Sequence, residues 1–363
     1  MITRILHSRL PLMIYTPVKV FDLAYFHAVY AAGALPVFDT EFLDSKEILQ
    51  KILQLSKENI VFGIRLASLD LPVLEALENQ PVSNLDLVVM PVSKTGDTLE
   101  KPHLGDTRVL LEIKDIGLTA RIDQADPHGL ILKGNEAAGQ VSKYSSFILM
   151  QWYLKHQNRP VFVHGGVGQY TGAGMLAAGV SGFVMDTQVL LADEAPVSPA
   201  FKNLLAMVEE GDSTEISIQD KQVFRVFAKL GTKVVRDLKQ EAVVLGEQAD
   251  GEQQLYEKIA SQVIALNDTQ APFVQSLFFM GQDGLFARYL AKKSNKLSDM
   301  IHGFFTAIGQ ALDCVDEFDP VRENSAFAKN QNTRLPLIQG PMANISDNPE
   351  FAAQVLDAGA LPF

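Results

Sequence analysis

The chain has 363 residues, of which 47 % are hydrophobic and 20 % are charged, and its formal net charge at pH 7 is −12. No apolar run approaches the roughly 20 residues that span a bilayer, and the acidic charge argues against a nucleic-acid partner, because binding to phosphate backbones depends on clustered lysine and arginine. The single cysteine, Cys314, excludes an intramolecular disulfide framework and is typical of a reducing compartment. We therefore expect a cytoplasmic globular protein without a membrane partner.

From the N-terminus, short runs rich in β-branched residues alternate with helical stretches, which is the pattern of βα units in a parallel sheet. The predicted strands, in chain order, cover residues 11–16, 34–39, 60–66, 85–92, 108–113, 129–133, 160–164 and 182–185. Eight such strands predict a (β/α)8 barrel over residues 1–197. An open doubly wound sheet is the alternative, and it is weakened because the first strand is not followed by the glycine fingerprint of dinucleotide-binding folds.

The pattern changes after the last predicted strand. Apolar residues recur at helical spacing in stretches such as EQQLYEKIASQVIAL, so we predict a mainly helical subdomain over residues 198–315. Residues 316–333 are polar and aperiodic, and we interpret them as a linker.

An internal repeat joins the two ends of the chain. RLPLMIYTP and RLPLIQGPM begin at Arg9 and Arg334, an offset of 325 (334 − 9), and the two AGALP blocks are offset by 326 (358 − 32). A coincidence of composition would not keep both ends of the segment in step. We therefore predict that residues 334–363 are the first βα unit of a truncated second copy of the domain, and that the chain is a fragment of a longer protein.

Two loops at predicted strand ends carry residues that suit a phosphate. After the seventh strand, Gly165 and Gly166 let backbone N–H groups turn toward a ligand, although a tight loop needs the same glycines. After the eighth strand, Thr187 can donate a hydroxyl, and the neighbouring Asp186 either opposes a phosphate or caps the next helix.

The loop after the sixth strand is the third candidate. Lys133 and Glu136 form either a charged site pair or a salt bridge that holds the loop. Gln140 can form hydrogen bonds but cannot exchange a proton at neutral pH. Among the seven histidines, whose spacing suggests no metal site, His164 is the candidate we keep, because it stands at a strand end beside the glycines.

Together, KGNEAAG, PVFVHGGVG, GFVMDTQVLL and FFMGQDGLFARYLA resemble, in this order, the 2-nitropropane dioxygenase or nitronate monooxygenase family of FMN-binding barrels, which includes flavin enoyl-ACP reductases. The chain is most similar to the modules embedded in bacterial polyketide and polyunsaturated fatty acid synthases. The resemblance covers residues 9 to about 313, and the family signature LPLIQGPMAN stands in the second copy, at 335–344.

The resemblance implies FMN as the cofactor. It places Gly165 and Gly166 at the FMN phosphate, Thr187 in the second phosphate loop, Gly139 beside the flavin and Gln282 in the Gly-Gln-Asp stretch. The first copy also departs from the family. Arg65 replaces an amide that contacts the flavin, and Gln140 replaces the typical catalytic histidine.

Two functions follow as hypotheses. The first is an FMN-type oxidoreductase module of a polyketide or fatty acid synthase with altered chemistry, in which Lys133, Glu136 or His164 takes the place of the absent histidine and Arg65 holds the phosphate or offsets Asp186. Its partners would be an acyl or small-molecule substrate and other synthase domains. The second is a catalytically degenerate scaffold that pairs with the intact second copy.

Overall fold

The computed structural model describes residues 6–92, 100–219, 221–229, 232–318, 321–342, 346 and 348–363. The chain divides into two compact units, Met1–Ala307 and Ile308–Phe363. Within these described ranges, no helix combines the length and the hydropathy that crossing a bilayer requires.

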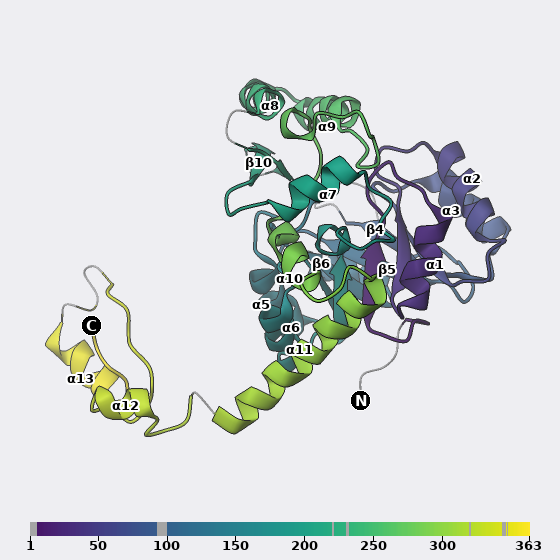
Figure 1. Cartoon of the computed structure of the whole chain (residues 1–363). Coiled ribbons are helices and arrows are strands. Elements are labelled where there is room, and N and C mark those ends of the chain that lie inside the picture. Colours follow the sequence, from purple (N-terminus) through teal and green to yellow (C-terminus); the bar gives the residue numbers. More distant parts are fainter. Residues whose placement is uncertain are drawn as a thin grey trace. The chain divides into compact units, whose positions relative to one another are not determined.

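The first unit is built on a closed barrel of parallel strands (Figure 1). In their order around the barrel the strands are β1 (Leu12–Tyr15), β2 (Leu35–Asp39), β3 (Phe62–Arg65), β4 (Leu85–Pro91), β5 (Arg108–Ile113), β6 (Gly129–Lys133), β8 (Val161–His164) and β9 (Gly182–Met185). β9 pairs with β1, which closes the ring. All eight predicted strands are present, so the predicted (β/α)8 barrel is confirmed and the open sheet is excluded.

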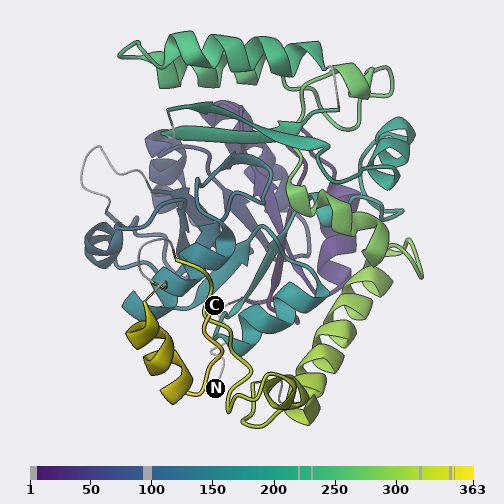
Figure 2. The ribbon, with the colours of Figure 1, turned by 90° about the vertical axis from the view of Figure 1, so that its left-hand side faces the viewer.

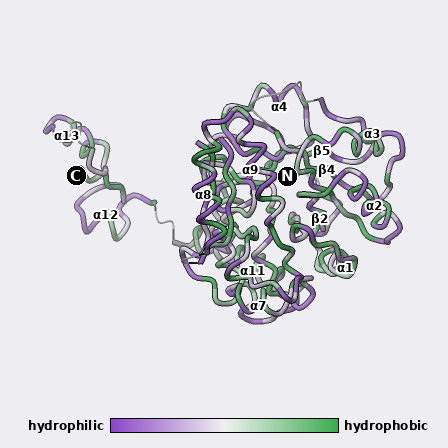
Figure 3. Tube along the Cα trace, turned by 90° about the horizontal axis from the view of Figure 1, so that it is seen from above, coloured by the Kyte–Doolittle hydropathy of each residue, from purple (hydrophilic) through white to green (hydrophobic). Residues whose placement is uncertain are grey.

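Helices surround the barrel, and α1, α2 and α3 lie outside β2, β4 and β5 when the unit is seen from above (Figure 3). The helices between the strands are α1 (Leu23–Ala31), α2 (Ser45–Leu55), α3 (Leu71–Asn79), α4 (Thr119–Ala125), α5 (Ser146–His156) and α6 (Gln169–Ala177). Local sequence sets several of their starts. Asp44 and Glu47 form a reciprocal capping box at α2, and Ser145 caps α5.

The barrel interior is filled by every second residue of the strands, as the period of a β-strand requires. Its apolar layers include Met13, Tyr15, Leu35, Val37, Leu87, Val89, Leu110, Ile131, Phe162 and Val184, all of them buried. Counting two residues onward along the strands gives Asp39, Glu112, Lys133, His164 and Asp186. The alternation that builds the core therefore also directs polar groups into the carboxyl end of the barrel.

The rest of the first unit is mainly helical, as predicted, but it contains an antiparallel sheet that we did not predict. Hairpin β10 (Ser213–Ile218) and β11 (Gln222–Phe227) pairs through β11 with the short strand β7 (Gly139–Val141). In Figure 2 the hairpin lies between the barrel and the long helix α8. The other elements are η1 (Thr187–Val189), α7 (Pro199–Ala206), α8 (Lys233–Leu245), α9 (Gly251–Gln262), η2 (Phe273–Gln275), η3 (Gln282–Phe286) and α10 (Ala287–Leu290).

The helix α11 (Leu297–Phe318) runs from the first unit into the second. The second unit also contains α12 (Ala326–Asn330), α13 (Pro349–Asp357) and a parallel bridge between Ile338 and Leu361. Our expected boundaries at residues 197, 315 and 333 stay a prediction. Within the predicted linker, residues 319 and 320 lie outside the described residues, as do 343 and 344 of the family signature.

Candidate functional site

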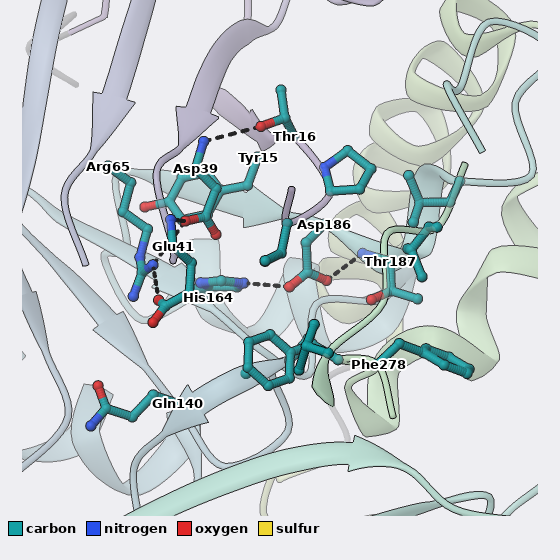
Figure 4. A pocket seen from close by; sticks show the side chains of 18 of the residues that line it. Tyr15, Thr16, Asp39, Glu41, Arg65, Gln140, His164, Asp186, Thr187 and Phe278 are labelled. Atoms are coloured by element: carbon teal, nitrogen blue, oxygen red, sulfur yellow. Dashed lines mark hydrogen bonds and ion pairs between the residues drawn. The ribbon is translucent and has the colours of Figure 1, made fainter. Parts of the chain in front are cut away.

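A small cavity lies at the carboxyl end of the barrel, with a volume of about 40 Å³. Six of the site residues predicted from sequence line it: Arg65, Lys133, Gly139, Gln140, His164 and Thr187. Figure 4 labels four of them, Arg65, Gln140, His164 and Thr187, which come from different strands and loops. The lining also includes residues that sequence reasoning did not select as a site, among them Tyr15, Asp39 and Glu41.

Arg65 is the centre of a buried ionic network, and its side chain is only 1 % exposed. Its Nη1 donates to Asp39 Oδ1 at 2.9 Å and to Glu41 Oε2 at 2.7 Å. Its Nε and Nη2 donate to the two carboxylate oxygens of Glu112 at 2.8 and 3.0 Å, a bidentate geometry. Arg65 is therefore held by three acidic side chains, Asp39, Glu41 and Glu112, whereas the side chain that contacts Asp186 is His164.

The same network lowers the pKa of Glu112. Burial raises the pKa of Glu112, but the adjacent Arg65 and Lys133 outweigh burial and hold that pKa well below its ordinary value. From outside the barrel, Tyr256 on α9 donates to Glu41 Oε1 at 2.9 Å. The ionic network therefore connects the barrel mouth to the helical part of the first unit.

His164 and Asp186 form the second polar group at the cavity. His164 Nε2 lies 3.0 Å from Asp186 Oδ2, and the Tyr15 ring meets the imidazole edge-on with 5.2 Å between centroids. Burial raises the pKa of Asp186, but the hydrogen bond from His164 and the charge on that side chain bring the pKa down to about 2. Asp186 also accepts from the Thr187 N–H, so it caps η1, one of the two alternatives that we considered.

Gln140, which stands where the family has its histidine, is bonded to a lysine. Lys114 Nζ donates to Gln140 Oε1 at 2.5 Å. Burial lowers the pKa of Lys114 to about 8.

The other predicted residues meet at a corner beside the cavity, where three of the motifs pack together. Gly165 has φ +106°, and a Cβ on it would lie 2.8 Å from Ala137 N. The Gln282 N–H donates to the Glu136 carbonyl at 2.8 Å, while the Gln282 side chain is exposed. The carboxylate of Glu136 accepts from the Ser146 N–H at 2.9 Å at the start of α5, which is a capping role and not the expected pair with Lys133.

The backbone N–H groups at this corner are engaged by the protein's own side chains. The Gly166 N–H donates to Asp283 Oδ2 at 3.1 Å, and the Asp186 N–H donates to Gln188 Oε1 at 3.0 Å. The Thr187 N–H donates to Asp186, as described above. Gln188 completes the arrangement by donating to Asp283 Oδ2 at 2.8 Å. A carboxyl group and an amide therefore occupy positions that the resemblance assigns to a phosphate.

Asp283 supports a prediction on pH dependence. Burial and the neighbouring charge of Asp186 raise the pKa of Asp283 well above its ordinary value. A carboxyl whose pKa is raised by folding binds more protons in the folded state, so it lowers stability as pH rises above about 4. We expect Asp283→Asn to stabilise the protein relative to wild type near pH 8, by on the order of 1 kcal/mol or more, with little effect near pH 4.

Urea unfolding at both pH values measures this effect. Asp268→Asn, at an exposed position, is the control and should change stability equally at both pH values. A destabilised Asp283→Asn protein near pH 8 would mean that the carboxylate is paired and ionised in the folded state.

With the geometry described, comparisons with known proteins become informative. No family model and no curated protein sequence matches the chain. Solved structures do match. FabK from Thermotoga maritima has a TM-score of 0.71 at 17 % identity and covers 87 % of this chain and 98 % of its own. The chain shares its fold.

Two further solved structures agree. Nitroalkane oxidase from Streptomyces ansochromogenes has a TM-score of 0.61 at 15 % identity, over 85 % of this chain and 98 % of its own. The enoyl reductase domain of MlnA, from the macrolactin biosynthesis cluster of Bacillus amyloliquefaciens, has a TM-score of 0.62 at 12 % identity, over 84 % and 95 %. The fold implied by the sequence resemblance is therefore confirmed.

Sequence reasoning missed Asp39, Glu41, Glu112, Lys114 and Asp283. The period of the strands contains a signal for two of them, because Asp39 and Glu112 stand two residues after the buried Val37 and Leu110. Asp283 belongs to the Gly-Gln-Asp stretch that the resemblance marked, but only the fold shows that it reaches Gly166 across 117 residues of sequence. In the described part of the chain, no cluster of three or more histidine, cysteine, aspartate or glutamate side chains is arranged to hold a metal ion.

Proposed function

We propose that this chain is a module of a polyketide or fatty acid synthase that keeps the fold of FMN-type oxidoreductases but does not hold FMN. In this proposal the chemistry is altered by loss of the cofactor, and the module serves the synthase as an interaction partner of a second, intact copy. The main observation in favour of this proposal is that the backbone N–H groups of Gly166, Asp186 and Thr187 donate to side chains of the protein itself.

Charge supports the same proposal. With its pKa near 2, Asp186 is ionised at neutral pH. This carboxylate pairs with His164 and accepts from the Thr187 N–H, so an anionic group of the protein already uses donors that a phosphate would need. The residues present at this corner therefore do not fit the FMN phosphate.

The small volume of the cavity is a second, independent observation in favour of the proposal. Pockets for cofactors and drug-sized ligands have volumes of about 300–1,000 Å³, whereas this cavity has about 40 Å³. Tyr15 and Arg65, both at most 2 % exposed, fill the carboxyl end of the barrel. A flavin ring would have to displace the Arg65 network, and that would separate buried charges from their partners.

The experiment is a flavin-binding measurement on the purified chain. We expect no flavin absorbance bands after purification and no change in FMN fluorescence when the protein is titrated into FMN. A yellow protein, or FMN quenching that saturates at micromolar protein, would contradict the proposal and favour the FMN-dependent enzyme.

A double variant tests the cause. Asp186→Gly with Asp283→Ser removes both carboxyl groups and frees two of the backbone N–H groups. We expect this variant to be stabilised by inorganic phosphate in a thermal-shift assay, whereas the wild type does not respond. If the variant responds no more than the wild type, these N–H groups are not a latent anion site.

A further inference from the structure

The second unit contains a helix that reproduces α1. Both α1 and α13 have nine residues, and their first and last residues are offset by the same 326 positions (349 − 23 and 357 − 31). Asp22 accepts from the N–H of Tyr25, and Asn348 accepts from that of Phe351, again at the 326 offset. Start, length and cap are therefore the same in both helices.

The strand register is reproduced as well. In the barrel, β1 pairs with β2 in parallel with Met13 opposite Leu35. In the second unit Ile338 stands opposite Leu361, also in parallel, and these residues are offset by 325 (338 − 13) and 326 (361 − 35). Parallel strands can pair in many registers, and a slip of one residue turns every side chain to the other face. The shared register therefore identifies the two segments as the same structural unit.

Their hydrogen bonds agree in detail. The Leu10 N–H donates to the Gly33 carbonyl at 2.9 Å, and the Leu335 N–H donates to the Gly359 carbonyl at 2.8 Å. Gly33 and Gly359 have φ +95° and +93°, a left-handed conformation that favours glycine at both helix ends.

The two units differ in what covers them. In the first, Tyr25, Phe26 and Val29 of α1 are buried, whereas no residue of α13 is buried. Met13 is 0 % exposed, and its counterpart Ile338 is 51 % exposed. In the first unit, the rest of the barrel covers the β1–α1–β2 segment, because β9 pairs with β1 and β3 pairs with β2.

We propose that residues 334–363 are the β1–α1–β2 portion of a second barrel, and that parallel strands equivalent to β9 and β3 cover its exposed edges. The shared register indicates which strands cover these edges. Because the two strands of the second unit pair in the same register as β1 and β2, their free edges match those that β9 and β3 cover in the first barrel. The occupant is a barrel of the same kind, not an unrelated protein.

The shared register also shows one position at which the second barrel differs from the first. Position 15 of the first copy corresponds to 340 (15 + 325), so Gly340 stands where Tyr15 fills the first barrel. A glycine leaves that volume to a ligand.

A graft tests the equivalence. Residues 334–363 replace residues 9–37 in the full chain, and we expect a cooperatively unfolding protein with the circular dichroism of the wild type. Its unfolding midpoint should be lower, because glycine in place of Tyr15 and alanine in place of the buried Phe26 leave cavities. Gly340→Tyr together with Ala352→Phe within the graft should recover most of the loss. A milder graft, residues 348–358 in place of 22–32, keeps β1 and Tyr15 but puts Ala352 at the position of the buried Phe26. It should fold cooperatively with a lowered midpoint, and Ala352→Phe within the graft should recover most of that loss.

Ile338→Asp is the matched control. It should leave the unmodified chain unchanged, since Ile338 is half exposed there, and it should abolish cooperative unfolding in the graft, where the residue takes the buried position of Met13. Failure of both grafts to fold, or an Ile338→Asp graft as stable as its parent, would overturn the proposal. These experiments measure folding alone, so their outcome is separate from that of the FMN titration.

Discussion

Replacing Arg65 by methionine is expected to lower the free energy of unfolding by about 3–5 kcal/mol at neutral pH, which is the cost of breaking a buried ion pair from one side. The substitution keeps the length of the side chain but leaves Asp39, Glu41 and Glu112 without their shared cation. Unfolding in guanidinium chloride or urea, followed by circular dichroism, measures the loss.

The pH dependence of this loss follows from Glu112. In the wild type its lowered pKa contributes stability above its ordinary pKa, and this contribution is lost as pH falls. Without Arg65, burial is opposed only by the weaker effects of Lys133 and Lys114, so the pKa of Glu112 rises and its contribution to stability at high pH is reduced. The difference between wild type and Arg65→Met should therefore grow from about pH 5 to about pH 8.

Arg159→Met is the matched control for Arg65. Arg159 also contacts two carboxylates, those of Asp123 at 2.9 Å and Asp126 at 3.0 Å, but both are more than half exposed. We expect a loss of about 0–1 kcal/mol, as is usual for exposed pairs. Equal losses in the two variants would mean that the Arg65 network is hydrated in solution.

Gly165→Ala is expected to cost about 3–4 kcal/mol of unfolding free energy, from two separable sources, a left-handed residue with a Cβ and an overpacked contact. Gly165 has φ +106°, and its new Cβ would lie 2.8 Å from the Ala137 N atom. A backbone atom in a loop held by several hydrogen bonds cannot move aside cheaply.

Gly179→Ala separates the two sources, because Gly179 has the same φ of +106° but no atom within 4 Å of an added Cβ. Its loss should be about 1–2 kcal/mol, from the backbone conformation alone. Comparison of the two unfolding midpoints in urea gives the cost of the close contact. Equal losses would show that the Gly165 loop is open at Ala137, and would restore the interpretation of Gly165 as a residue reserved for a ligand.

The contrast between Gly165 and Asp283 explains why the motifs were easier to find than their function. The glycine loop and KGNEAAG are visible in sequence because each is local, and together they indicated the family fold. What the loops do is set by their partners. Gly165 packs on Ala137, and Asp283 reaches the Gly166 N–H, so the corner is closed by contacts that local sequence does not encode.

By itself, the sequence determined the eight strands and the barrel, because each strand is a short apolar run whose period and ends are local properties. It also contained the inward alternation that carries Asp39 and Glu112 to the Arg65 network. Only the tertiary structure decided that Arg65 is shared by three acids, 24 to 47 residues away, and that β11 pairs with β7. The physical reason is closure of the barrel, since ring order and register bring together side chains whose attraction depends on burial and distance, and neither is a property of a local stretch.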